Sequence, residues 1–139
     1  MATINASINI NTDIIGNISI NKEMVMTKAG TNTGLENTTG LSAKTVQSVT
    51  AFKLFDNTDA TTLKASKVYI RNTGSSSSDF FYIGFGEDLD AATVETIGRL
   101  YGNDWMLIPW DAVAATSHDI YAKASVATPM TIEFMAFVE

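Results

Sequence analysis

The chain contains no cysteine and only one histidine, His118. Without cysteine there are no disulfides, no thiolate metal sites and no cysteine nucleophile. A single histidine excludes a histidine-cluster metal site and leaves one imidazole as a candidate general base. His118 lies in a polar stretch, residues 115–119, without a serine-nucleophile motif, which favours an exposed turn residue. We therefore expect no enzyme activity and no cofactor or metal.

Charged residues are scarce as well. They form 17% of the 139 residues, compared with about 25% in ordinary soluble domains. Thr, Ser, Asn and Gly supply the polarity instead, and this composition suits strands and turns better than exposed helices. The net charge of -6 and the scattered positions of the nine Lys and Arg residues argue against a nucleic-acid partner.

Long apolar runs are also missing. No stretch approaches the about 18 unbroken apolar residues of a membrane span, and residues 1–10 lack the basic and apolar regions of a signal peptide. We expect a soluble protein with no membrane partner and no export signal. Its mass of 15.0 kDa suits one domain that buries its own hydrophobic core.

Apolar and polar residues alternate strictly from residue 4, as in a half-buried strand. One face of this strand carries Ile4, Ala6, Ile8 and Ile10. Residues 18–26 repeat the pattern, so the two segments predict a β-hairpin. Residues 28–44 contain three glycines and two large apolar residues, which indicates a long loop. We predict an N-terminal strand or arm with a flexible loop at 1–44, and a β-sandwich body at 45–139.

The body is a series of short apolar segments separated by turn signals. Residues 67–86 predict a β-hairpin with a serine-rich tip, and residues 87–102 fit either a helix or another loop. Further strands are predicted at residues 46–55, 105–108, 120–124 and 130–138. About eight strands without alternating helices predict an all-β fold, an antiparallel β-sandwich of the jelly-roll type.

Two of these strands, 80–85 and 130–138, are apolar on both faces. Their second faces are formed by Phe80, Tyr82, Met135 and Phe137. An uncovered apolar row promotes aggregation, so something must cover these side chains. The candidates are loops of the same chain, the N-terminal segment before the long loop, and a neighbouring identical subunit.

Acidic residues cluster at 56–59 and 87–90, where carboxylates are candidate ligands for calcium or a glycosidase pair. Neither spacing fits a calcium-binding EF-hand loop, and turn or capping roles explain Asp and Asn at both places. Trp105 and Trp110, the only tryptophans, flank an apolar run. We consider three interpretations of this pair: core packing, sugar stacking, and an anchor in a protein interface. Because residues five apart on a strand point to opposite faces, one flat sugar platform is disfavoured.

Four segments of the chain form a distinctive combination. They are residues 68–74 (VYIRNTG), 105–109 (WMLIP), 119–124 (DIYAKA) and 130–139 (MTIEFMAFVE). Together they resemble small β-rich virion proteins of tailed bacteriophages. The resemblance implies a jelly-roll-like decoration or cement protein that binds the major capsid protein, often as a homotrimer. It also implies a place in the virion, after assembly in the host cytoplasm.

Such a protein has an interface in place of an active site. An N-terminal strand on a long loop could add to a neighbour's sheet and cover its isoleucine face there. The interface candidates are Ile4, Ile8, Ile10, Phe80, Tyr82, Trp105, Trp110, Met135 and Phe137. The main alternative is a carbohydrate- or receptor-binding module of a phage tail or fibre, which would stack sugars on Trp105, Trp110 or Tyr101. A hydrolase that uses paired carboxylates or His118 ranks last.

Overall fold

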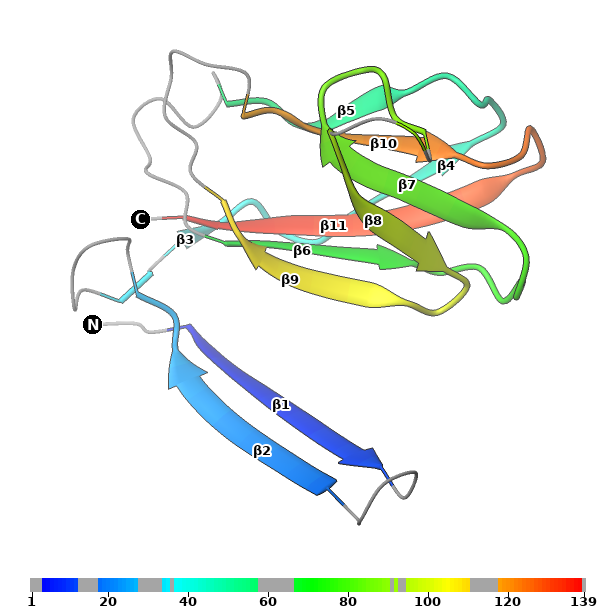
Figure 1. The fold of residues 1–139 in the computed structure, drawn as a ribbon. Coiled ribbons are helices and arrows are strands. Elements are labelled where there is room, and N and C mark those ends of the chain that lie inside the picture. The colour runs from blue at the N-terminus through cyan, green and yellow to red at the C-terminus, as the bar shows by residue number, and fades with distance from the viewer. Residues whose placement is uncertain are drawn as a thin grey trace.

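The described part of the chain consists of β-strands joined by turns and loops (Figure 1). In this computed structural model, the described residues are 4–12, 18–27, 34–35, 37–57, 67–90, 92, 95–110 and 118–138. The strands are β1 (Asn5–Thr12), β2 (Ile18–Val25), β3 (Asn37–Thr38), β4 (Ser42–Val46), β5 (Phe52–Phe55), β6 (Lys67–Asn72), β7 (Phe80–Phe85), β8 (Thr96–Tyr101), β9 (Trp105–Pro109), β10 (Ile120–Ala124) and β11 (Met130–Val138). Within these ranges there is no helix long and apolar enough to cross a membrane.

The described strands form antiparallel sheets of three sizes. β1 and β2 pair as a separate hairpin, which projects from the rest of the molecule in Figure 1. A four-stranded sheet has the order β5-β10-β7-β8, and a five-stranded sheet has the order β3-β11-β6-β9, with β4 also paired to β11. The two larger sheets enclose one hydrophobic core in a sandwich-like arrangement. The predicted all-β, antiparallel fold is therefore confirmed.

The strand pairs of the sandwich are nested along the chain. β4 pairs with β11, β5 with β10, β6 with β9, and β7 with β8. The first and third pairs lie in the five-stranded sheet, and the second and fourth lie in the four-stranded sheet. Long-range pairing of this kind brings the last strand of the chain beside the first strand of the sandwich.

The predicted hairpin at residues 67–86 is wrong. β6 and β7 lie in different sheets, so the serine-rich segment between them crosses from one sheet to the other. Packed sheets lie about 10 Å apart, a gap that a seven-residue connection can span. The two apolar runs are adjacent in the sequence but do not pair with each other: β6 pairs with β11 and β9, and β7 pairs with β10 and β8.

Three further expectations change in the structure. β3 and β4 fall partly within the predicted loop at 28–44, and both pair with β11. The predicted strand at 46–55 is interrupted, because β4 ends in one sheet and β5 begins in the other. Residues 96–101 form β8 rather than a helix. The proposed division of the chain at residues 44 and 45, which β4 crosses, stays a prediction.

The core between the sheets is built from the inward face of each strand. Its largest fully buried members are Phe81, Ile70, Ile83, Ile120, Ile132 and Val68. The ring of Phe55 lies 5.5 Å from the rings of both Trp110 and Phe134, measured between centroids, and so ties the two sheets together. Burial of each such side chain contributes about 1.5–3 kcal/mol.

The polar side chain of Asn72, at the end of β6, is buried at 1% exposure. Its Nδ2 donates to the carbonyl oxygen of Leu100 in β8 at 3.0 Å, and its Oδ1 accepts from the backbone N–H of Gly74 at 2.9 Å. Its backbone N–H donates to the carbonyl oxygen of Asp104, and its own carbonyl oxygen accepts from Asn103. Asn72 therefore links the five-stranded sheet to β8 and to the turn between β8 and β9.

Candidate functional site

The N-terminal hairpin has one apolar and one polar face. The register pairs Ile10 with Ile20, Ile8 with Lys22 and Ala6 with Met24, so these residues share one face. Ile8, Ile10, Ile20 and Met24 are 38%, 46%, 40% and 47% exposed, respectively. The predicted strand and hairpin are thus confirmed, but the strand is not half-buried along its length. An isolated two-stranded hairpin is only marginally stable in water, so this face is suited to contact another surface.

The opposite face of the hairpin is lined by asparagine and serine. Asn11 donates to the side-chain oxygen of Asn9 at 2.9 Å and accepts from the Ser19 hydroxyl at 2.7 Å. Glu23 and Val25, which is 48% exposed, lie on this face near the base of the hairpin, so its apolar surface is confined to that end. The two faces of the ribbon therefore differ sharply in chemistry, and only one of them resembles an interface.

The base of the hairpin packs on the outer face of the five-stranded sheet. Phe137 of β11 is 9% exposed because it lies in a cluster with Met26 and Leu35, which are 3% and 0% exposed. The partly buried side chains around this cluster are Ile4, Ala6, Tyr69, Leu107 and Met135. Backbone bonds from Met26 to the carbonyl of Ile4 and from Leu35 to that of Met26 hold the covering segments together.

The composition of this cluster shows which segments cover the second face of β11. Of the three candidates, the N-terminal segment provides Ile4, Ala6 and Met26, and the long loop provides Leu35. Phe137 and Met135 are therefore covered by their own chain rather than presented to a partner. Ile4 is likewise used inside the molecule, whereas Ile8 and Ile10 are exposed on the hairpin.

The second face of β7 is covered differently. The Arg99 guanidinium lies 5.0 Å from the centroid of the Phe80 ring and 5.3 Å from that of Tyr82. The Phe80 ring also contacts the rings of Tyr82 and Tyr101, at 4.9 and 5.0 Å between centroids. Side chains of the neighbouring strand β8 thus cover part of this face, and all these groups remain at the surface.

The two tryptophans lie on opposite faces of the five-stranded sheet, as their spacing predicts. Trp105 is 52% exposed on the outer face, beside Arg71 in the register. Trp110 is 4% exposed in the core, and its Nε1–H donates to the carbonyl oxygen of His118 at 2.6 Å. Trp110 is thus a core residue rather than an exposed interface residue, and the two rings form no common platform.

The predicted acidic cluster at 56–59 is partly engaged in an ion-pair network; residues 58 and 59 lie outside the described residues. The Lys53 ammonium lies 2.7 Å from a carboxylate oxygen of Asp119 and 2.9 Å from one of Asp56. These two contacts raise the pKa of Lys53. Asp119 also accepts the backbone N–H of Asn57 at 2.7 Å. These carboxylates are therefore bound to a cation of the chain itself.

The cluster at 87–90 belongs to the connection between β7 and β8. Glu87, Asp88 and Asp90 are exposed, whereas Leu89 between them is fully buried. Asp90 accepts the backbone N–H of Ala92, which is a turn role. In the described ranges, no group of three or more His, Asp or Glu side chains is placed to hold a metal ion.

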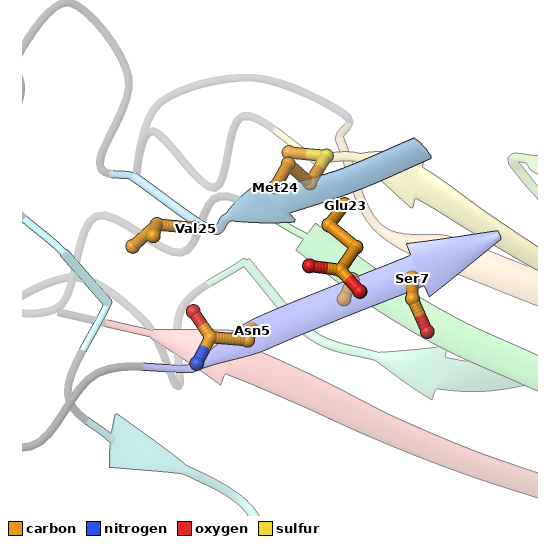
Figure 2. Close-up of a pocket in the computed structure, with 6 residues that line it drawn as sticks. Asn5, Ser7, Glu23, Met24 and Val25 are labelled. Atoms are coloured by element: carbon orange, nitrogen blue, oxygen red, sulfur yellow. The ribbon is translucent and has the colours of Figure 1, made fainter. Parts of the chain in front are cut away.

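A concavity of about 420 Å³ lies at the base of the hairpin. It is lined by Asn5, Ala6, Ser7, Glu23, Met24 and Val25. Figure 2 shows the Glu23 carboxylate reaching over β1, where Ser7 is its cross-strand partner. Only one ionisable group, Glu23, is among these lining residues, so they supply no acid–base pair.

Several residues that shape these surfaces are not among the predicted interface candidates. Ile20 and Met24 complete the exposed apolar face, Met26 and Leu35 cover Phe137, and Arg99 covers Phe80. The alternation in residues 18–26 was a usable signal for the first two. The cover by Arg99 depends on the register of β7 and β8, which no local pattern reveals.

The chain matches no protein-family model, no curated protein and no solved structure.

Proposed function

We propose that the chain is a structural protein of a phage virion, which decorates or cements the head through protein–protein contacts. The observation that carries the proposal is the exposed apolar face of the β1–β2 hairpin, on an arm that projects from the sandwich (Figure 1). Covering this face in an assembly would stabilise both the hairpin and the contact. The sequence resemblance to virion proteins favours the capsid as the place of this assembly.

The nested strand pairs support the finer assignment of the sandwich as a jelly roll. A jelly roll is a double sheet of eight strands with Greek-key connections. Here β4 to β11 supply eight strands, with each sheet built from two of the nested pairs. This architecture is common in capsid and lectin domains, so it favours the virion proposal without selecting a ligand.

The proposed partners are further copies of the chain, as a homotrimer, and the major capsid protein. Ile8, Ile10, Ile20 and Met24 would lie against a neighbouring subunit, and Ile4 and Met26 would keep the hairpin attached to its own sheet. The apolar surface then extends from the intramolecular contact to the intermolecular one, since Ile4 directly precedes β1, and Ala6, Ile8 and Ile10 share one face of that strand. The proposed location is the virion.

Replacing both Ile10 and Ile20 with asparagine is expected to reduce the native mass from about three times 15.0 kDa to that of one chain. The reason is that each buried isoleucine contributes about 1.5–3 kcal/mol to a contact. Light scattering on a sizing column, over a range of concentrations, measures the effect. Point substitutions are preferable to removal of residues 1–44, which would also remove β3 and part of β4.

The matched control is Asn9→Ser with Asn21→Ser, the neighbouring cross-strand pair on the polar face, which should leave the native mass unchanged. A trimer that survives the isoleucine substitutions would count against the hairpin as the contact. The virion location is tested separately, by quantitative mass spectrometry of purified particles of the phage that encodes the chain. Its absence from those particles would refute the decoration role.

A carbohydrate- or receptor-binding module of a phage tail or fibre is the second candidate, and Trp105 is the observation that favours it. This ring is 52% exposed on a sheet face, where it could stack on a sugar. Glycan-array binding that is lost in Trp105→Ala would support this function. Trp110→Ala is unsuitable as a test, because it would remove a ring from the core.

A further inference from the structure

The outer face of the four-stranded sheet carries a cationic-aromatic patch, which we define as Phe80, Tyr82, Arg99, Tyr101 and Lys123. Lys123 of β10 lies opposite Tyr82 of β7, and Tyr82 lies opposite Arg99 of β8. The three side chains thus form a row across three adjacent strands. Arg99 contacts the rings of Phe80 and Tyr82, and Phe80 contacts Tyr101.

The two cations of this patch are not neutralised by any described carboxylate. Among the described residues, ion pairs within 4.0 Å join Lys53 to Asp56 and Asp119, and Arg71 to Glu133. Neither Arg99 nor Lys123 takes part in these pairs. In a chain with a net charge of -6, the patch therefore presents two cations that have no ion pair within 4.0 Å to a described carboxylate.

The chemistry of the patch favours a carboxylate from a polypeptide. A guanidinium that lies over aromatic rings can still direct its N–H groups to a carboxylate in a bidentate contact. Since Arg99 lies over the rings of Phe80 and Tyr82, it competes with a sugar for stacking there. Two cations are also few for a nucleic-acid backbone, whose binding uses a larger basic surface.

The chain itself carries a complementary surface. We define the acidic connection by Glu87, Asp88 and Glu95, which are described and exposed acidic residues between β7 and β8. Buried Leu89 and the backbone bond from Phe85 to the carbonyl of Glu95 anchor these residues. The acidic connection joins the end of β7 to the start of β8 (Figure 1), whereas the register pairs Phe80 with Tyr101 at the opposite end of these strands.

We propose that the cationic-aromatic patch of one chain binds the acidic connection of a second copy. The cations lie opposite Tyr82 in the middle of β7, and the carboxylates lie beyond its last residue, Phe85. Opposite charges on separate parts of one sheet favour a head-to-tail contact, which closes into a ring when the rotation between copies allows it. This inference rests on the proposed assembly of the chain with copies of itself. It adds a second contact, distinct from the apolar face of the hairpin.

Charge reversal with rescue tests the proposal. In full-length protein, Arg99→Glu or Asp88→Lys alone should weaken self-association at least about tenfold, measured by sedimentation equilibrium at low salt. The two substitutions combined in one chain should recover most of the lost affinity, because each contact again joins opposite charges. High salt should weaken the wild-type association and reduce the difference between the variants.

Lys44→Glu is the matched control, since it changes the net charge equally but lies on β4 of the other sheet. Lys123→Glu provides a second reversal within the patch that leaves the contacts of Arg99 with the rings in place, and thermal unfolding verifies that each variant is folded. Association unchanged in Arg99→Glu and Lys123→Glu but lost in the Ile10 and Ile20 variant would overturn this inference and keep the role of the hairpin. A wild-type chain that is monomeric at every concentration would also overturn it, whereas particle mass spectrometry judges the virion proposal independently.

Discussion

Replacing Asn72 with aspartate is expected to lower the free energy of unfolding by about 3–5 kcal/mol at neutral pH. The side chain is 1% exposed, so the substitution buries a carboxylate. The new group could still accept the N–H of Gly74, but in its ionised form it cannot donate to the carbonyl oxygen of Leu100. The ionised carboxylate and the carbonyl oxygen of Leu100 are both hydrogen-bond acceptors, and they would then face each other where β6 meets β8.

The pH dependence of this variant follows from the same burial. Burial and the nearby carbonyl raise the pKa of the introduced carboxyl above its unfolded value of about 3.9. A raised folded-state pKa means that the stability is retained below about pH 3.9 and is lost as the pH rises through the raised value. Relative to wild type, the variant should therefore be least destabilised in acid.

Urea unfolding of wild type and variant between acidic and neutral pH measures both effects. Asn21→Asp is the matched control, because it makes the same chemical change on the exposed face of the hairpin and should be nearly neutral. Asn72→Leu, which removes both hydrogen bonds without adding a charge, should lose about 1–3 kcal/mol for each group left unsatisfied, with no acid recovery. Equal stability of Asn72→Asp and wild type at neutral pH would contradict the buried link.

Strands with a regular inward face could be predicted from the sequence. The boundaries of β10 and β11 agree with the predicted segments 120–124 and 130–138, and the first hairpin was identified from its alternation. In β10 the alternate residues Ile120, Ala122 and Ala124 are buried, so burial follows the period of a strand. The local sequence pattern was therefore sufficient to predict a strand where one face of that strand is covered.

Edge strands and long-range pairing could not be predicted in this way. In β4 only Val46 is even partly buried, because this strand lies at the edge and is held by its backbone bonds to β11. In β8 the exposed Ile97 and partly exposed Tyr101 gave an apparent helical spacing. The partners of β6 and β7 are set by the nested pairing, and adjacent apolar runs say nothing about which sheet each will join.

The candidate functional surface could also be predicted only in part, because some of its contacts depend on long-range pairing. The exposed positions Ile8 and Ile10 follow from the alternation of β1, and the need for a cover over Phe137 follows from that of β11. The identity of the covering residues does not follow from a local pattern, since Leu35, which covers Phe137, lies in a polar loop, and Arg99, which covers Phe80, lies on another strand. An apolar residue in an otherwise polar loop was the only signal for Leu35.

Gly84→Ala is expected to destabilise the protein by about 1–3 kcal/mol, through overpacking at the bulge of β7. The register between β7 and β8 shifts between Ile83 and Gly84, which brings the backbone of Glu95 close to Gly84. A Cβ at this position would lie 2.7 Å from Cδ2 of Leu89 and 2.9 Å from the carbonyl carbon of Glu95. Leu89 is fully buried and the carbonyl oxygen of Glu95 accepts the N–H of Phe85, so neither neighbour can move without loss.

Gly98 on the paired strand β8 provides the matched control for Gly84→Ala. A Cβ there would meet nothing within 4 Å, so Gly98→Ala should leave the packing intact. It should even stabilise by about 0.5–1 kcal/mol, because alanine loses less backbone entropy than glycine when a strand forms. Thermal or urea unfolding of the two variants should therefore give changes of opposite sign on neighbouring strands. Neither glycine has a positive φ, so two equal losses would mean that the close approach of Glu95 to Gly84 is not the cause.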